Sequence, residues 1–198
     1  MLTVGVDLAA EPSNTAVARI SWTAGYAEVE RLVVGADDAV LAEEIATASK
    51  AGIDCPLGWP RRFVDFVVQH RDAAFVAPVD VAGKDWRRLL ANRETDLVTR
   101  HVVGLAPLSV AADRIGLAAM RCAGLLAQLA AEGGPVDRSG AGVVVEVYPA
   151  AALKHWGLPF RGYKGAANAA VRGEVVDRLA AAAPWLRFDA YEQATYSA

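Results

Sequence analysis

Apolar residues alternate with small or polar ones in the stretch LTVGVDL, residues 2–8, close to the start of the chain. Alternation with a period of two is typical of a β-strand. The turn residues EPSN follow at 11–14, and further strands are predicted over residues 15–23 and 27–34, with Gly25 between them. Three strands joined by such short connections predict an antiparallel meander.

The remainder of the chain alternates helical and strand patterns. Asp37 and Asp38 resemble an N-cap and a first-turn acid of a helix, and Gly52 is predicted to end this helix. The stretch GIDCPLGWP, residues 52–60, predicts a short strand that ends in a turn, and VVVEVY, residues 143–148, predicts an apolar strand covered on both faces. Helices are predicted over 63–70, within 78–90 after a loop, and over 115–129, 150–156 and 165–183. We therefore predict an α/β fold, in which a mixed sheet of three antiparallel strands and then parallel strands is flanked by helices.

The composition predicts one folded domain over residues 1–198. Hydrophobic residues make up 54% of the chain and charged residues 22%, which excludes disorder as a general description. No apolar run approaches the roughly 18–20 residues of a membrane-spanning helix, and the N-terminus lacks the basic region of a signal peptide. We expect a cytoplasmic protein without a membrane partner, in which Cys55 and Cys122 are buried thiols and not part of a disulfide framework.

The charge of the chain gives little indication of a nucleic-acid partner. The net charge is −3, so the chain lacks the overall electrostatic footprint of a tight nucleic-acid binder, although a local basic groove is not excluded. Arginine pairs at 61–62 and 87–88, each with a tryptophan nearby in sequence, either line such a groove or lie on solvated helix faces.

Three acids lie near the carboxyl ends of predicted strands, where charged residues are costly unless they are paired or bind a metal. Asp7 follows VGV, Asp54 follows GI, and Glu146 follows VVV. If these strands are neighbours, the three carboxylates converge, and Mg²⁺ or Mn²⁺ would relieve their repulsion. Each acid taken alone is equally well explained as an edge-strand residue or a cap of the next element.

The segments that carry these acids resemble a known family. The stretches VGVDLA (4–9), IDCPLGWP (53–60), RETD (93–96), VEVYP (145–149) and Tyr163-Lys164 are similar to those of the predicted RNase H-like nuclease family, domain of unknown function 429. The likeness spans residues 3 to 164, and IDCPLGWP and VEVYP are its specific parts. The resemblance implies an RNase H-like sheet, with Asp7, Asp54 and Glu146 as catalytic residues that bind the metal.

The chain departs from this family at its C-terminus. Members usually continue into an acidic helix, on which RNase H-like nucleases commonly carry a final metal-binding acid. This chain stops at Thr195-Tyr196-Ser197-Ala198, so the domain is predicted to lack that helix. Either the chain is truncated, the missing part is disordered, or this member lacks the ligand. Asp189 and Glu192 are nearby acids that do not match the motif.

Four further residues are candidates for binding a substrate phosphate or base. Arg93 could bind a phosphate with Asp96 as its orienting partner, or this segment could only cap a helix. Tyr148 could stack on a base or donate a hydrogen bond to a ligand, or simply lie at the rim of the sheet. Lys164 could bind a phosphate or a developing oxyanion, or be an exposed lysine on a loop.

These residues predict a metal-dependent phosphodiester hydrolase, a nuclease that acts on RNA, DNA or a nucleotide-like phosphodiester with Mg²⁺ or Mn²⁺. The alternative is a catalytically incomplete RNase H-like module that binds a partner or serves as a scaffold. Geometry discriminates between them, because a shared metal site requires the three carboxylates to lie within about 8 Å of one another.

Overall fold

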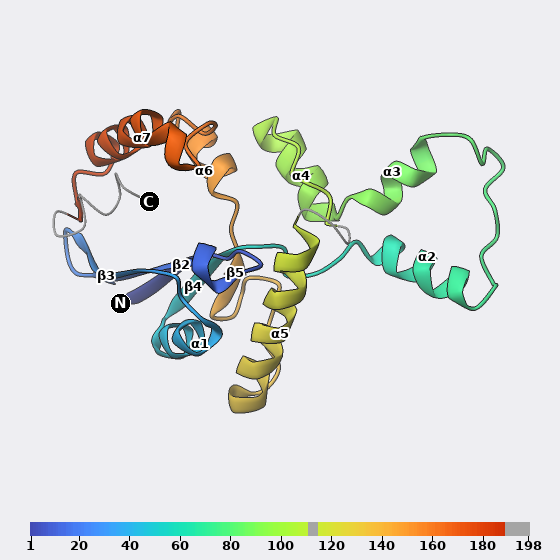
Figure 1. The fold of residues 1–198 in the computed structure, drawn as a ribbon, viewed down its shortest axis with the longest axis horizontal. Helices are drawn as coiled ribbons and strands as arrows, with labels where there is room; N and C mark the ends of the chain where they lie inside the picture. Colours follow the sequence, from blue (N-terminus) through green and yellow to red (C-terminus); the bar gives the residue numbers. More distant parts are fainter. Residues whose placement is uncertain (111–114, 189–198) are drawn as a thin grey trace.

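Six strands form one mixed sheet in the computed structural model, which describes residues 1–110 and 115–188 (Figure 1). The strand order across the sheet is β5-β4-β1-β2-β3-β6. The strands are β1 (Leu2–Asp7), β2 (Ala16–Trp22), β3 (Ala27–Val34), β4 (Lys50–Asp54), β5 (Val144–Glu146) and β6 (Leu186–Arg187).

The first three strands form the predicted antiparallel meander, and the later strands pair in parallel. β2 pairs antiparallel with both β1 and β3. β4 lies parallel to β1, β5 lies parallel to β4, and the two-residue β6 lies parallel to β3. The predicted α/β fold, with three antiparallel strands followed by parallel strands, is therefore confirmed.

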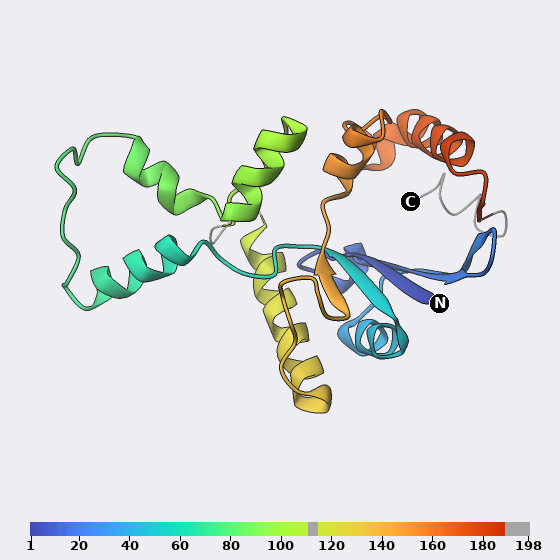
Figure 2. The same cartoon turned by 180° about the vertical axis from the view of Figure 1, so that it is seen from behind.

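Helices lie on both sides of this sheet. α1 (Asp38–Thr47) and α5 (Gly116–Gly133) lie on one side, and α6 (Pro149–His155) and α7 (Ala169–Ala182) lie on the other (Figures 1 and 2). The main hydrophobic core joins the sheet to α1 and α5, and its most buried members include Leu41, Ile53, Cys122 and Leu125. Alternate residues of β1 and β4 enter this core because successive side chains of a strand point to opposite faces.

Several boundaries predicted from the sequence were wrong: the helix predicted over 165–183, for example, begins only at Ala169. Gly52 and the end of β5 are the clearest cases. Gly52 does not end α1, which stops at Thr47; it lies inside β4 and pairs with Gly5. A Cβ at Gly52 would lie 2.9 Å from the Val147 side chain, so this glycine permits a close approach between neighbouring segments. β5 is shorter than the predicted 143–148, because Pro149 already begins α6.

A second group of helices lies between β4 and α5 in the chain. α2 (Arg61–Arg71) and α3 (Asp85–Ala91) project away from the sheet, whereas α4 (Glu94–Val103) contacts α6 (Figures 1 and 2). Short 3₁₀ turns, η1 (Pro12–Asn14) and η2 (Ala166–Asn168), complete the described elements. None of the helices in the described residues is both long and apolar enough to cross a membrane. The predictions for the C-terminal tail, including Asp189 and Glu192, fall outside the described residues.

Candidate functional site

Two of the predicted metal ligands, Asp7 and Asp54, lie side by side at the ends of adjacent parallel strands. Asp7 is the last residue of β1, Asp54 is the last residue of β4, and the two are direct partners in the register of the strands. Val6 and Ile53, which precede them, are buried in the core, so the alternation along each strand turns the two carboxylates away from it. The sheet therefore brings together two acids that are far apart in the sequence.

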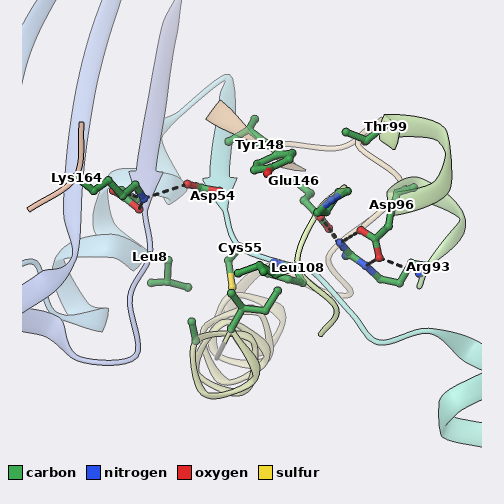
Figure 3. A pocket seen from close by; sticks show the side chains of 17 residues that line it. Leu8, Asp54, Cys55, Arg93, Asp96, Thr99, Leu108, Glu146, Tyr148 and Lys164 are labelled. Carbon is green, nitrogen blue, oxygen red and sulfur yellow. Dashed lines mark hydrogen bonds and ion pairs between the residues drawn. The ribbon is translucent and has the colours of Figure 1, made fainter. Parts of the chain in front are cut away.

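The ammonium group of Lys164 contacts both of these carboxylates, and Figure 3 shows Lys164 beside Asp54. Its Nζ lies 3.5 Å from each carboxylate oxygen of Asp7 and 3.9 Å from Oδ2 of Asp54. The loop that carries Lys164 is held in place by its neighbours: Asn168 donates a 2.7 Å hydrogen bond to the Lys164 carbonyl, and Arg172 donates to two other carbonyls of the loop. We call Asp7, Asp54 and Lys164 the lysine-bridged acids.

The third predicted ligand, Glu146, is held by Arg93. Glu146 ends β5, the strand next to β4, where it pairs with Ile53. Its two carboxylate oxygens accept hydrogen bonds from Nη1 and Nη2 of Arg93, both at 2.7 Å, and Oε2 also accepts one from the Leu57 backbone N–H at 3.0 Å. A bidentate pair of this kind is among the strongest hydrogen-bonded contacts between side chains.

Asp96 completes this second cluster. Arg93 is the N-cap of α4, and its backbone N–H donates to Oδ2 of Asp96 at 2.8 Å, while its guanidinium donates to both Asp96 oxygens. Asp96 therefore orients Arg93 and also caps the helix, the two roles that were alternatives from sequence. Burial alone would lower the pKa of Arg93, but the hydrogen bonds with Glu146 and Asp96 outweigh it and raise that pKa. We call Arg93, Asp96 and Glu146 the arginine anchor.

The electrostatics of the lysine-bridged acids differ from those of the anchor. Burial raises the pKa of Asp54 to about 6, against the opposing effect of Lys164, and the charges of Asp7 and Glu146 add to the increase. Burial would lower the pKa of Lys164, but the charges of Asp7 and Asp54 raise it overall. One ammonium group therefore does not offset the burial of the Asp54 carboxylate, and a further cation would stabilise its ionised form.

All seven predicted site residues line one cavity of about 250 Å³. In the close view of Figure 3, Glu146 and Tyr148 lie between Asp54 and Arg93. Tyr148 is at once the N-cap residue of α6 and part of this wall, so it lies at the rim of the sheet and also faces the cavity. The structure thus brings every predicted site residue into one place.

The apolar part of the cavity wall was not predicted from sequence. Leu8, Pro107, Leu108 and Ile115 contribute to it. Leu8 continues the alternation of the first strand and could have been found, whereas Pro107 and Leu108 belong to a loop without a sequence signal. Thr99 also lines the cavity, one helical turn after Thr95, a spacing that places both on the same face of α4.

Cys55 follows Asp54 directly and lines the same cavity. Both cysteines are free and buried, as predicted. The side-chain hydrogen bond with Cys122 and burial both raise the pKa of the Cys55 thiol. Cys55 is therefore a protonated thiol at neutral pH and unsuited to act as a nucleophile.

The donor set determines how a metal would fit. Within residues 1–110 and 115–188, no group of three or more His, Cys, Asp or Glu side chains is arranged to hold a metal ion. Both carboxylate oxygens of Glu146 are instead engaged by Arg93. Asp7 and Asp54 are the adjacent pair of carboxylates that could hold a hard divalent cation, since Mg²⁺ is commonly bound by one or two carboxylates together with retained waters.

Comparison with known proteins adds a family assignment. A family model described as "Protein of unknown function (DUF429)" matches residues 5–196. Searches of curated proteins and of solved structures find no match.

Proposed function

Because the chain belongs to the DUF429 family, whose description states no activity, we propose a function from the cavity itself: a metal-dependent phosphodiester hydrolase. In this proposal Asp7 and Asp54 hold Mg²⁺ or Mn²⁺, and the substrate is RNA, DNA or a nucleotide-like phosphodiester. The observation that carries it is the pairing of these two carboxylates at the ends of adjacent parallel strands, with a lysine ammonium against both. The sheet order, three antiparallel strands and then parallel ones, supports the RNase H-like character of the proposal.

The residues of the cavity have separate tasks in this proposal. A bound divalent cation would supply the activation of a water molecule and the stabilisation of the leaving oxygen. Lys164 binds a non-bridging phosphate oxygen, because its side chain is 64% exposed and its carboxylate partners are no closer than 3.5 Å. Tyr148 contacts a base or sugar of the substrate, and the apolar wall at Leu8 and Leu108 excludes water from one side.

Glu146 and Arg93 have a positioning task in the same scheme. Arg93 has both guanidinium edges engaged by carboxylates, so it holds α4 against the end of β5. Glu146 becomes a metal ligand only if it releases Arg93. Glu146→Gln should weaken metal binding if Glu146 is a ligand, and should leave it unchanged if Glu146 only positions Arg93.

A specific observation favours the alternative, a catalytically incomplete binding or scaffold module. A lysine ammonium already compensates Asp7 and Asp54, and an arginine already compensates Glu146. If these contacts persist in solution, the acids serve structure and no metal enters.

Calorimetric titration with Mg²⁺ and Mn²⁺ distinguishes the two functions. We expect binding to the wild type, loss of binding in Asp7→Asn and in Asp54→Asn, and retention in Glu146→Gln if Glu146 only positions Arg93. Hydrolysis of bis(p-nitrophenyl) phosphate should follow the same order. Absence of metal binding to the folded wild type would reject the hydrolase and leave the scaffold module.

A further inference from the structure

The segment from residue 61 to residue 91, which we call the arm, stands apart from the rest of the molecule. It consists of α2, the loop 72–84 and α3, and it projects beyond the sheet and its covering helices (Figures 1 and 2). None of its 31 residues is buried. Its exposed large apolar side chains are Val64, Val67, Val68, Val76, Val79, Val81 and Leu89.

The arm has too little internal packing to account for its helices. Phe66, Phe75 and Trp86 form a small aromatic cluster between α2 and α3, with ring centroids 5.0 to 6.2 Å apart. α2 has 11 residues and α3 has 7, whereas isolated helices shorter than ~12–15 residues are marginal in water. The arm therefore requires a further surface to cover its valines.

The charges of the arm favour a protein surface over a nucleic acid. Three of its five arginines form ion pairs with its own acids, Arg61–Asp65, Arg71–Asp72 and Arg88–Asp85, and Arg87 donates to two backbone carbonyls of the arm. Paired arginines do not release counterions from a phosphate backbone as free ones do. The arm carries six Arg and Lys against four Asp and Glu, whereas the remaining residues carry fourteen against nineteen. A net positive arm is thus complementary to the net negative remainder of another copy.

An apolar surface suited to the arm lies on α5, which stands beside the root of the arm in Figure 1. Leu117 and Met120, one turn apart on this helix, are 58% and 50% exposed. The charged side chains of α5 leave this face free, because Arg121 turns inward to Asp38 and to the Ala9 carbonyl, and Glu132 lies at the far end.

We propose that the chain forms a two-fold dimer in which the arm of each copy docks on the exposed face of α5 in the other copy. The reciprocal exchange closes the assembly, so it yields a dimer and not a filament. It covers the valines of both arms and brings opposite net charges together. This inference does not depend on the hydrolase proposal.

Sedimentation velocity over a concentration series tests the dimer with two double variants. Val64→Asp with Val68→Asp changes two exposed valines one turn apart on α2, and Leu117→Asp with Met120→Asp changes the α5 face. We expect a mass of two chains for the wild type and of one chain for each double variant. Val34→Asp, at an exposed valine of β3, is the matched control and should remain dimeric. Circular dichroism confirms that each variant is folded.

Mixing the two double variants sharpens the test. In a reciprocal dimer the intact arm of the α5 variant meets the intact α5 of the arm variant, so the mixture should recover a heterodimer that neither variant forms alone. A wild type that remains monomeric throughout the series would overturn the proposal. So would a dimer that survives both double variants, or a monomer that binds single-stranded RNA through the arm.

Discussion

The lysine-bridged acids and the arginine anchor lie in the same cavity but are built differently. In the anchor the guanidinium–carboxylate contacts with Glu146 are 2.7 Å, and Asp96 is only 3% exposed. In the lysine-bridged acids the contacts are 3.5 to 3.9 Å, and the Lys164 side chain is 64% exposed. Short, buried and bidentate contacts hold two elements together, whereas long and exposed contacts with one ammonium group allow the cation to exchange. The comparison separates a cluster that holds two elements together from a cluster whose cation can exchange.

The largest change in the free energy of unfolding is expected when the arginine anchor is broken. Arg93→Met leaves the buried Asp96 and the partly buried Glu146 without their shared cation. Removal of one partner from a buried ion pair costs about 3 kcal/mol or more, so the free energy of unfolding in urea should fall by that amount. Arg100→Met on the exposed face of the same helix is the control and should change it by less than about 0.5 kcal/mol. Equal stability of the two variants would mean that Arg93 does not hold α4 in place.

The raised pKa of Asp54 predicts that a substitution there increases the free energy of unfolding, whereas Arg93→Met decreases it. The pKa of Asp54 in the folded protein is about 6, above the ordinary aspartate pKa of 3.8. The folded protein therefore binds the proton more tightly, so stability from this group is fully present below pH 3.8 and is lost as the pH rises through 6. Asp54→Asn should raise the free energy of unfolding at pH 7 by about 1 to 3 kcal/mol, at 1.36 kcal/mol per pKa unit.

Urea unfolding at several pH values checks this prediction. The gain of Asp54→Asn over the wild type should shrink as the pH falls from 7 to 4. Asp7→Asn is the control, because its side chain is 56% exposed and should contribute less than about 1 kcal/mol. A gain that is independent of pH would show that Asp54 is not destabilised by its charge.

Removal of the Lys164 ammonium should strengthen metal binding at Asp7 and Asp54. Lys164→Met removes a cation that competes for Asp7 and Asp54, so Mn²⁺ affinity should rise about tenfold, equivalent to ~1.4 kcal/mol. Turnover of a phosphodiester should fall in the same variant, because the phosphate loses its positive partner. Lys84→Met, at the N-cap of α3, is the control for calorimetry and turnover. Unchanged affinity would mean that no metal binds at these two acids.

The smallest effect is expected on the free energy of unfolding of Lys164→Met. Exposed ion pairs contribute about 0–1 kcal/mol, so Lys164→Met should lower the free energy of unfolding by less than about 1 kcal/mol. Thermal unfolding of Lys164→Met and of Arg93→Met, measured side by side, therefore compares how much each cluster contributes to stability. A loss as large as that of Arg93→Met would make both clusters structural.

Much of the local structure could be predicted from the sequence, because period-two alternation and capping residues act over short stretches. The β3 boundaries and the helix that begins at Asp38 both follow from such patterns. Gly52 was misinterpreted because a glycine that ends a helix and a glycine that admits a neighbouring side chain look the same in sequence. β6 has only two residues, too few for an alternation to be recognised.

The sequence by itself determined which residues are candidates for the chemistry of this cavity, since acids at the ends of apolar strands are costly and therefore conspicuous. Only the tertiary structure decided their partners. Asp7 meets Asp54 because β4 crosses over to pair beside β1, and Glu146 meets Arg93 across 53 residues of chain. Such pairings depend on the free energy of the whole sheet and its covering helices, which no short stretch of sequence contains.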